Sequence, residues 1–71
     1  SKNTSFSESI IAKFPMILYA LEDNDISVSE LFKSVKYGIE DVGEFIEILD
    51  CLYALGKVEL NAETRCLYYV G

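Results

Sequence analysis

The chain has 71 residues, a formal net charge of −6 at neutral pH and a hydrophobic content of 51%. A chain of this length forms a single domain, and its small core leaves it marginally stable by itself. The negative charge repels phosphate backbones and anionic lipid headgroups, so direct binding to DNA or to a membrane surface is disfavoured.

The composition also bears on location and on cofactors. No run approaches the roughly 18 consecutive apolar residues of a membrane span, and the first residues lack the basic start and apolar core of a secretory signal. We therefore expect a cytoplasmic protein. The chain has no His and only two cysteines, so we expect neither a metal nor a cofactor. Cys51 and Cys66 are interpreted as reduced, mostly buried thiols, with a disulfide between them as the open alternative.

The chain is expected to begin with an arm and an interrupted helix. Residues 1–7 are small and polar, which predicts a flexible N-terminal arm before a domain over 8–71. Ser7 or Ser9 can cap the first helix. Pro15 lies within this helix, where it removes a backbone bond and clashes with an earlier carbonyl, so we expect a kink or break near Phe14. The apolar face has helical spacing and consists of Ile10, Ile11, Phe14, Ile17, Leu18 and Leu21.

The second helix carries the clearest local signal in the chain. Ser27 is a predicted cap, Glu30 follows it at capping-box spacing, and Ile26 can pack on Leu31 as a hydrophobic staple. The helix is therefore predicted to begin at Val28, and Gly38 to end it. Its expected buried face consists of Val28, Leu31, Phe32 and Val35.

The third predicted helix, in the stretch Glu40 to Gly56, organises the rest of the chain. Asp41 can cap it, with Glu44 three residues later, and Gly56 can end it in a left-handed conformation. Its expected buried face is Val42, Phe45, Ile46, Leu49, Leu52, Tyr53 and Leu55. The remaining positions include Glu40, Asp41, Glu44, Glu47 and Asp50 with no Lys or Arg, which predicts a solvent-facing strip of unneutralised negative charge.

A β-hairpin is predicted after this helix. Val58 and Leu60 alternate with charged residues, 61–64 form a turn, and Arg65 to Val70 are rich in strand formers. For the second strand two alternatives stay open, with either Cys66, Tyr68 and Val70 or Leu67 and Tyr69 facing inward. The predicted fold is mainly α with a small hairpin: a winged helix of three helices followed by a two-stranded wing.

Catalysis is not expected from these residues. There is no His for general-base chemistry, no Gly-rich phosphate cradle, and no Ser or Cys with a locally positioned base. Glu40, Glu44 and Glu47 approach one another by helical spacing, but a charged, solvated helix face is a better interpretation of them than a Mg²⁺ site. No catalytic, cofactor-binding or metal-binding residues are therefore assigned.

The run EILDCLYALGKVEL, from Glu47 to Leu60, together with the early SES at 7–9 and the cap at Ser27 to Glu30, resembles a known family. It is similar to the small middle component of bacterial ABC-three-component systems, which are related to Lamassu-type defence. The resemblance implies a non-catalytic adaptor between an SMC-like or Rad50-like ABC ATPase and a third operon-encoded component in an anti-phage or conflict system. It leaves a homodimer open. Pro15 departs from the family pattern.

Two groups of residues are candidates for partner binding, since aromatic residues are enriched at interface centres and charged ones at rims. The alternatives to the adaptor function are a transcription regulator and an inhibitor. The first is a winged helix that binds DNA, which the carboxylates of the third helix oppose, and the second is an acidic protein that mimics DNA. The candidate rim is Glu40, Glu44, Glu47 and Asp50, and the candidate anchors are Tyr19, Tyr37, Tyr68 and Tyr69.

Overall fold

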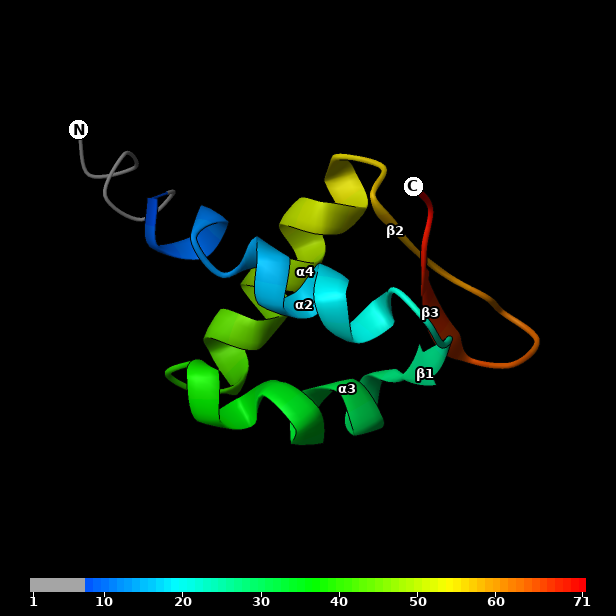
Figure 1. Cartoon of the computed structure of the whole chain (residues 1–71), viewed down its shortest axis with the longest axis horizontal. Helices are drawn as coiled ribbons and strands as arrows, with labels where there is room; N and C mark the ends of the chain where they lie inside the picture. The colour runs from blue at the N-terminus through cyan, green and yellow to red at the C-terminus, as the bar shows by residue number, and fades with distance from the viewer. Residues whose placement is uncertain (1–7) are drawn as a thin grey trace.

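Three helices and a small antiparallel sheet make up the computed structural model, which describes residues 8–71 (Figure 1). The arm predicted for residues 1–7 lies outside the described residues. The mainly helical fold is confirmed, and the arrangement is compatible with a winged helix. In chain order the elements are α2 (Phe14–Leu21), β1 (Ile26–Ser27), α3 (Val28–Val35), the 3₁₀ helix η1 (Lys36–Gly38), α4 (Val42–Ala54), β2 (Val58–Leu60) and β3 (Cys66–Tyr69).

The break predicted near Phe14 is confirmed. Residues 8–11 form a separate helical turn, closed by bonds from the Ala12 N–H to the Glu8 carbonyl (3.1 Å) and from the Lys13 N–H to the Ile10 carbonyl (3.0 Å). Helix α2 then begins at Phe14 with the proline in its first turn. Proline is tolerated there because the first N–H groups of a helix have no intrahelical acceptor. The chain therefore changes direction before α2.

The boundaries of α4 follow from local bonds that the sequence predicted. The Asp41 carboxylate accepts from the Glu44 N–H at 2.9 Å, which caps the first turn. At the other end Gly56 has φ +75°. Its N–H donates to the Tyr53 carbonyl, and the Lys57 N–H donates to the Leu52 carbonyl at 2.9 Å. This pair of bonds is the Schellman motif, which needs a left-handed residue where Gly56 lies.

The sheet has three strands in the order β1-β3-β2, where a two-stranded wing was predicted. Strand β1 pairs with β3 through Ile26 opposite Leu67 and Ser27 opposite Cys66. Strand β1 has only two residues, too few to show the alternation of apolar and polar side chains that predicts a strand. It is therefore defined only by its pairing with β3. Of the two inward-facing sets left open for β3, neither is buried as a whole: Leu67 is in the core, Tyr69 is exposed, and Cys66 and Tyr68 are half-buried.

The core lies between the helices and one face of the sheet. Within α3, Leu31 is buried and Phe32 is half-buried, with its ring centroid 5.1 Å from that of Phe45 in α4. Val28 and Ile11, which were expected on buried faces, are exposed. The buried residues are Ile10, Ile17, Leu21, Leu31, Val35, Phe45, Ile48, Leu52, Val58 and Leu67.

The predicted buried face of α4 is wrong in its rotation about the helix axis. Phe45 and Leu52 are buried as expected, but the third core residue is Ile48, which was not in the predicted face. Four residues of that face are exposed: Val42, Ile46, Tyr53 and Leu55. Apolar residues occupy more than half the circumference of α4, so spacing alone did not identify which side packs inward.

Candidate protein-interaction surface

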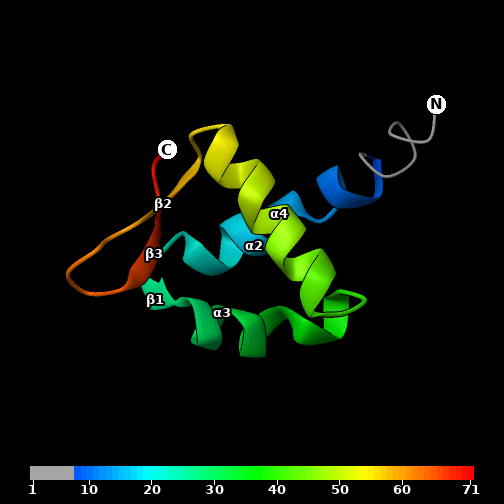
Figure 2. The same cartoon turned by 180° about the vertical axis from the view of Figure 1, so that it is seen from behind.

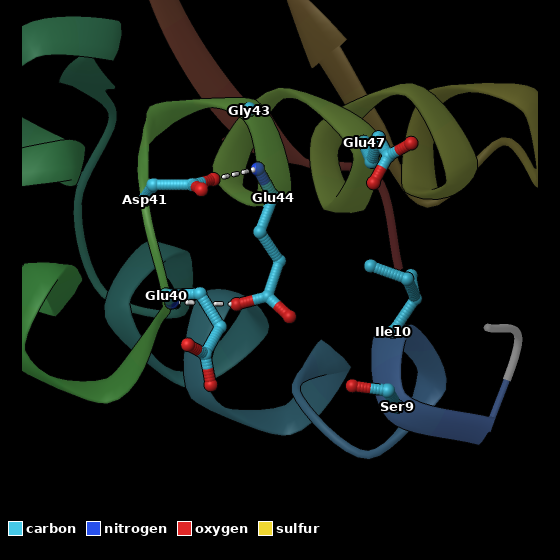
Figure 3. Close-up of a pocket in the computed structure, with 7 residues that line it drawn as sticks. All are labelled: Ser9, Ile10, Glu40, Asp41, Gly43, Glu44 and Glu47. Atoms are coloured by element: carbon cyan, nitrogen blue, oxygen red, sulfur yellow. Dashed lines mark hydrogen bonds between the residues drawn. The ribbon is translucent and has the colours of Figure 1, made fainter. Parts of the chain in front are cut away.

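The N-terminal end of α4 forms one wall of an open hollow of about 380 Å³. The opposite wall is the helical turn at 8–11 (Figure 3). The lining residues are Ser9, Ile10, Glu40, Asp41, Gly43, Glu44 and Glu47. The structure therefore gathers three of the four predicted rim acids at one place, while Asp50 lies further along α4.

Glu44 is held by two donors and is not a free rim charge. Its Oε1 lies 2.7 Å from Lys13 Nζ and accepts the Glu40 N–H at 2.8 Å (Figure 3 shows the second bond). The Lys13 hydrogen bond, followed by the bond from the Glu40 N–H, lowers the pKa of Glu44 below its ordinary value. The expectation of a wholly unneutralised acidic strip is corrected here, because Lys13 neutralises one of its members.

The other acids of the predicted rim remain at the surface. The side chains of Glu40, Glu47 and Asp50 are exposed. Within 8–71, the ion pairs are Lys13 with Glu44 and Lys33 with Glu30, so these three carboxylates have no basic partner in the described part of the chain.

The four candidate tyrosines do not form one cluster. Tyr19 and Tyr69 line a second, smaller hollow of about 170 Å³ together with Pro15, Leu18 and Glu22. Tyr68 is half-buried in β3 opposite Glu59. Tyr37 is exposed in η1, at the end of α3 away from the sheet, and Lys36 Nζ lies 5.3 Å from its ring centroid. Neither hollow contains both a tyrosine and a predicted rim acid.

The sequence reasoning missed a row of apolar side chains on the outside of α4. Val42, Ile46 and Tyr53 are 57%, 44% and 62% exposed, and Leu49 between them is half-buried. We call these four residues the outer stripe. Figure 2 shows α4 crossing in front of α2, with no other helix or strand of residues 8–71 in front of it. The usable signal was the excess of apolar positions on α4, more than one packed face requires.

No group of three His, Cys, Asp or Glu side chains in residues 8–71 is placed to hold a metal ion. Cys51 and Cys66 are both free and half-buried. None of the described helices is long and apolar enough to cross a membrane.

A comparison with protein families identifies the chain. The family model described as ABC-three component (ABC-3C) system Middle Component 7 matches residues 1–67. The chain belongs to this family. The resemblance drawn from the sequence is thereby confirmed, and this middle component is one part of a multi-protein system. No curated protein and no solved structure matches this Middle Component 7 chain.

Proposed function

We propose that the chain is a non-catalytic adaptor that joins an SMC-like ABC ATPase to a third operon-encoded component in a bacterial anti-phage or conflict system. Family membership supports a role within a multi-component system. The observation that carries the adaptor role is the outside of α4, where apolar and acidic side chains are exposed side by side. Exposed apolar patches with polar surroundings are typical of protein interfaces.

The chemistry of α4 favours polypeptide over nucleic acid as the partner. In a winged helix that reads DNA, the corresponding helix brings basic and amide side chains to base edges and phosphates. Helix α4 contains no Lys or Arg, and it presents Glu47 and Asp50 to solvent. Its apolar side chains suit contact with another protein.

The absence of catalysis is part of the proposal. The acids at the N-terminal end of α4 have structural roles, since Asp41 caps the helix and Glu44 binds Lys13. The exposed carboxylates of Glu47 and Asp50 have no basic partner among the described residues, and the chain has no His to act with them.

The adaptor role is tested by reconstituting the operon with and without this chain. The ATPase and the third component are co-expressed, with an affinity tag on the third component only. We expect the ATPase to co-purify when the middle component is present and to be lost when its gene is deleted. If the other two components associate equally well without it, or if the chain binds neither, the adaptor role is refuted.

A further inference from the structure

The outer stripe has the spacing of a helix–helix seam. Val42, Ile46, Leu49 and Tyr53 are separated by four, three and four positions. This alternation is the a/d repeat by which one helix packs along another. The row covers about three turns, or about 16 Å of helix.

The seam is separate from the side of α4 that holds the fold together. Phe45, Ile48 and Leu52 are buried in the core. At about 100° per residue, the outer stripe lies roughly a quarter turn around the axis from them. The buried residues of α4 are Phe45, Ile48 and Leu52, so the exposed residues of the stripe are free to contact another molecule.

The charge beside the stripe indicates what kind of helix would pack there. Going round α4 away from the core, the first charged side chain after the stripe is the exposed Asp50, which takes the flanking e position when Ile46 and Tyr53 are a residues and Leu49 is a d residue. Helix α4 has no Lys or Arg. The carboxylate of Asp50 and the net charge of −6 therefore favour a partner helix that has positive charge beside its apolar row.

The same charge disfavours a second copy of this chain as the occupant. Two copies would each bring a net charge of −6 to the contact. A symmetric seam would also bring the Asp50 carboxylates of both copies to the edges of the same contact, because both copies present the same surface. Like charges along the edge of a helical seam oppose pairing.

We infer that the outer stripe of α4 is the docking seam for a basic amphipathic helix of a partner protein, about three turns long. Apolar residues of that helix pack on Ile46 and Tyr53, and a Lys or Arg beside its apolar row faces Asp50. This inference rests on the proposed adaptor function and specifies the surface and the partner chemistry it would use. It uses the helix-in-groove type of recognition, with a flat seam in place of a groove.

The test uses the purified chain and a synthetic probe. The probe is a fluorescent peptide of about 18 residues, long enough to populate helix, with Leu at a/d positions and Lys or Arg beside them. A second peptide has Glu in place of the basic residues. We expect the chain to bind the basic peptide at least about tenfold more tightly than the acidic one, as measured by fluorescence anisotropy.

Two chain variants show whether the stripe is the site. Ile46→Gln and Tyr53→Gln change no charge and keep a good helix former, so general electrostatic attraction is preserved. Each should weaken binding of the basic peptide by about tenfold or more. Ile11→Gln is the matched control, because it removes an exposed apolar side chain from the helical turn at 8–11, and this variant should bind the basic peptide as tightly as the unaltered chain does. Circular dichroism melts check that all three variants are folded.

The possible results are distinguishable. If the two stripe variants bind as tightly as the unaltered chain, or if the acidic peptide binds equally well, the seam is refuted. It is also refuted if sedimentation shows a dimer that the stripe variants dissociate, because a second copy is then the occupant. An operon partner that co-purifies equally with the stripe variants would remove the seam and leave the adaptor role. If peptide binding depends on the stripe but no component co-purifies with the chain, the seam is retained and the adaptor role is refuted.

Discussion

At the scale of single residues, Glu44 shows how one side chain can serve a helix end and a tertiary contact together. Its backbone N–H is capped by Asp41, and its carboxylate accepts the Glu40 N–H at the positive end of the α4 dipole. The same carboxylate binds Lys13, which lies 31 positions earlier in the chain. The sequence predicted the cap by Asp41 because capping is local. It gave no indication of the contact with Lys13, which depends on where the chain turns before α2.

Because the folded protein lowers the pKa of Glu44 below its ordinary value of 4.5, this carboxylate should add a pH-dependent contribution to stability. The contribution is present above the pKa of the unfolded chain and is lost as the pH falls through the lower pKa of the folded state. Glu44→Gln removes it, and Lys13→Met removes the part that is due to Lys13. The difference in unfolding free energy between the unaltered chain and either variant should therefore shrink as the pH falls below about 4.5.

Urea unfolding of the three proteins at several pH values between neutral and acidic measures this difference. The double variant is the control: once Lys13 has been replaced, the further change of Glu44 should have a smaller effect near neutral pH than it has alone. A difference that stays constant over the whole pH range would contradict the role assigned to this pair.

At the scale of elements, α4 has three bands of side chains around its axis. One band is the core, in which Ile48 is fully buried. The next is the outer stripe, and the third is acidic. The sequence predicted the helix and both of its ends, but merged the first two bands into one buried face. Periodicity identifies apolar rows on a helix, whereas only packing against α2, α3 and the sheet decides which row is inside.

This rotation of α4 predicts that alanine substitution changes the stability of the fold much more at Ile48 than at Ile46, two positions away. Ile48→Ala should destabilise the fold by about 2–4 kcal/mol, because it removes buried methyl groups and leaves a cavity. Ile46→Ala should change stability by no more than about 0.5 kcal/mol, since the side chain is 44% exposed and Ala is a good helix former. Urea unfolding at neutral pH measures both changes.

Ile48→Val is the companion variant in case the alanine variant does not fold, with an expected loss of about 0.5–1.5 kcal/mol. Equal effects at positions 46 and 48, or a larger loss at 46, would mean that α4 packs with the rotation first predicted from the sequence.

At the scale of the whole molecule, the net charge of −6 and the carboxylates of α4 act in the same direction. The order of elements is compatible with a winged helix, a fold that often binds DNA. Function depends on the side chains placed on a fold, so the arrangement alone does not make this chain a DNA-binding protein. Its long-range field repels a duplex before any contact is made.

We therefore predict no retention of the chain on immobilised duplex DNA even at about 50 mM salt, where electrostatic binding is strong. A basic helix-turn-helix protein run on the same column is the positive control. Retention that weakens steeply as salt is raised would contradict the prediction and favour the transcription-regulator alternative.

The sequence by itself determined the features that depend on neighbours a few residues apart. These include the helix break before Pro15, the caps at Ser27 and Asp41, and the end of α4 at Gly56, because proline, capping side chains and glycine act on the adjacent backbone. It also identified the family, and it named the acids that gather at the hollow beside α4.

Only the tertiary structure decided what depends on segments far apart in the chain. It formed β1 by pairing Ile26 with Leu67, joined Lys13 to Glu44, and turned Ile48 inward while leaving Ile46 at the surface. The placement of α2, η1 and β3 also separates the candidate tyrosines. Their spacing along the chain did not indicate this placement. Burial is a property of the packed whole, so a helix that is apolar around most of its circumference does not specify its inner side.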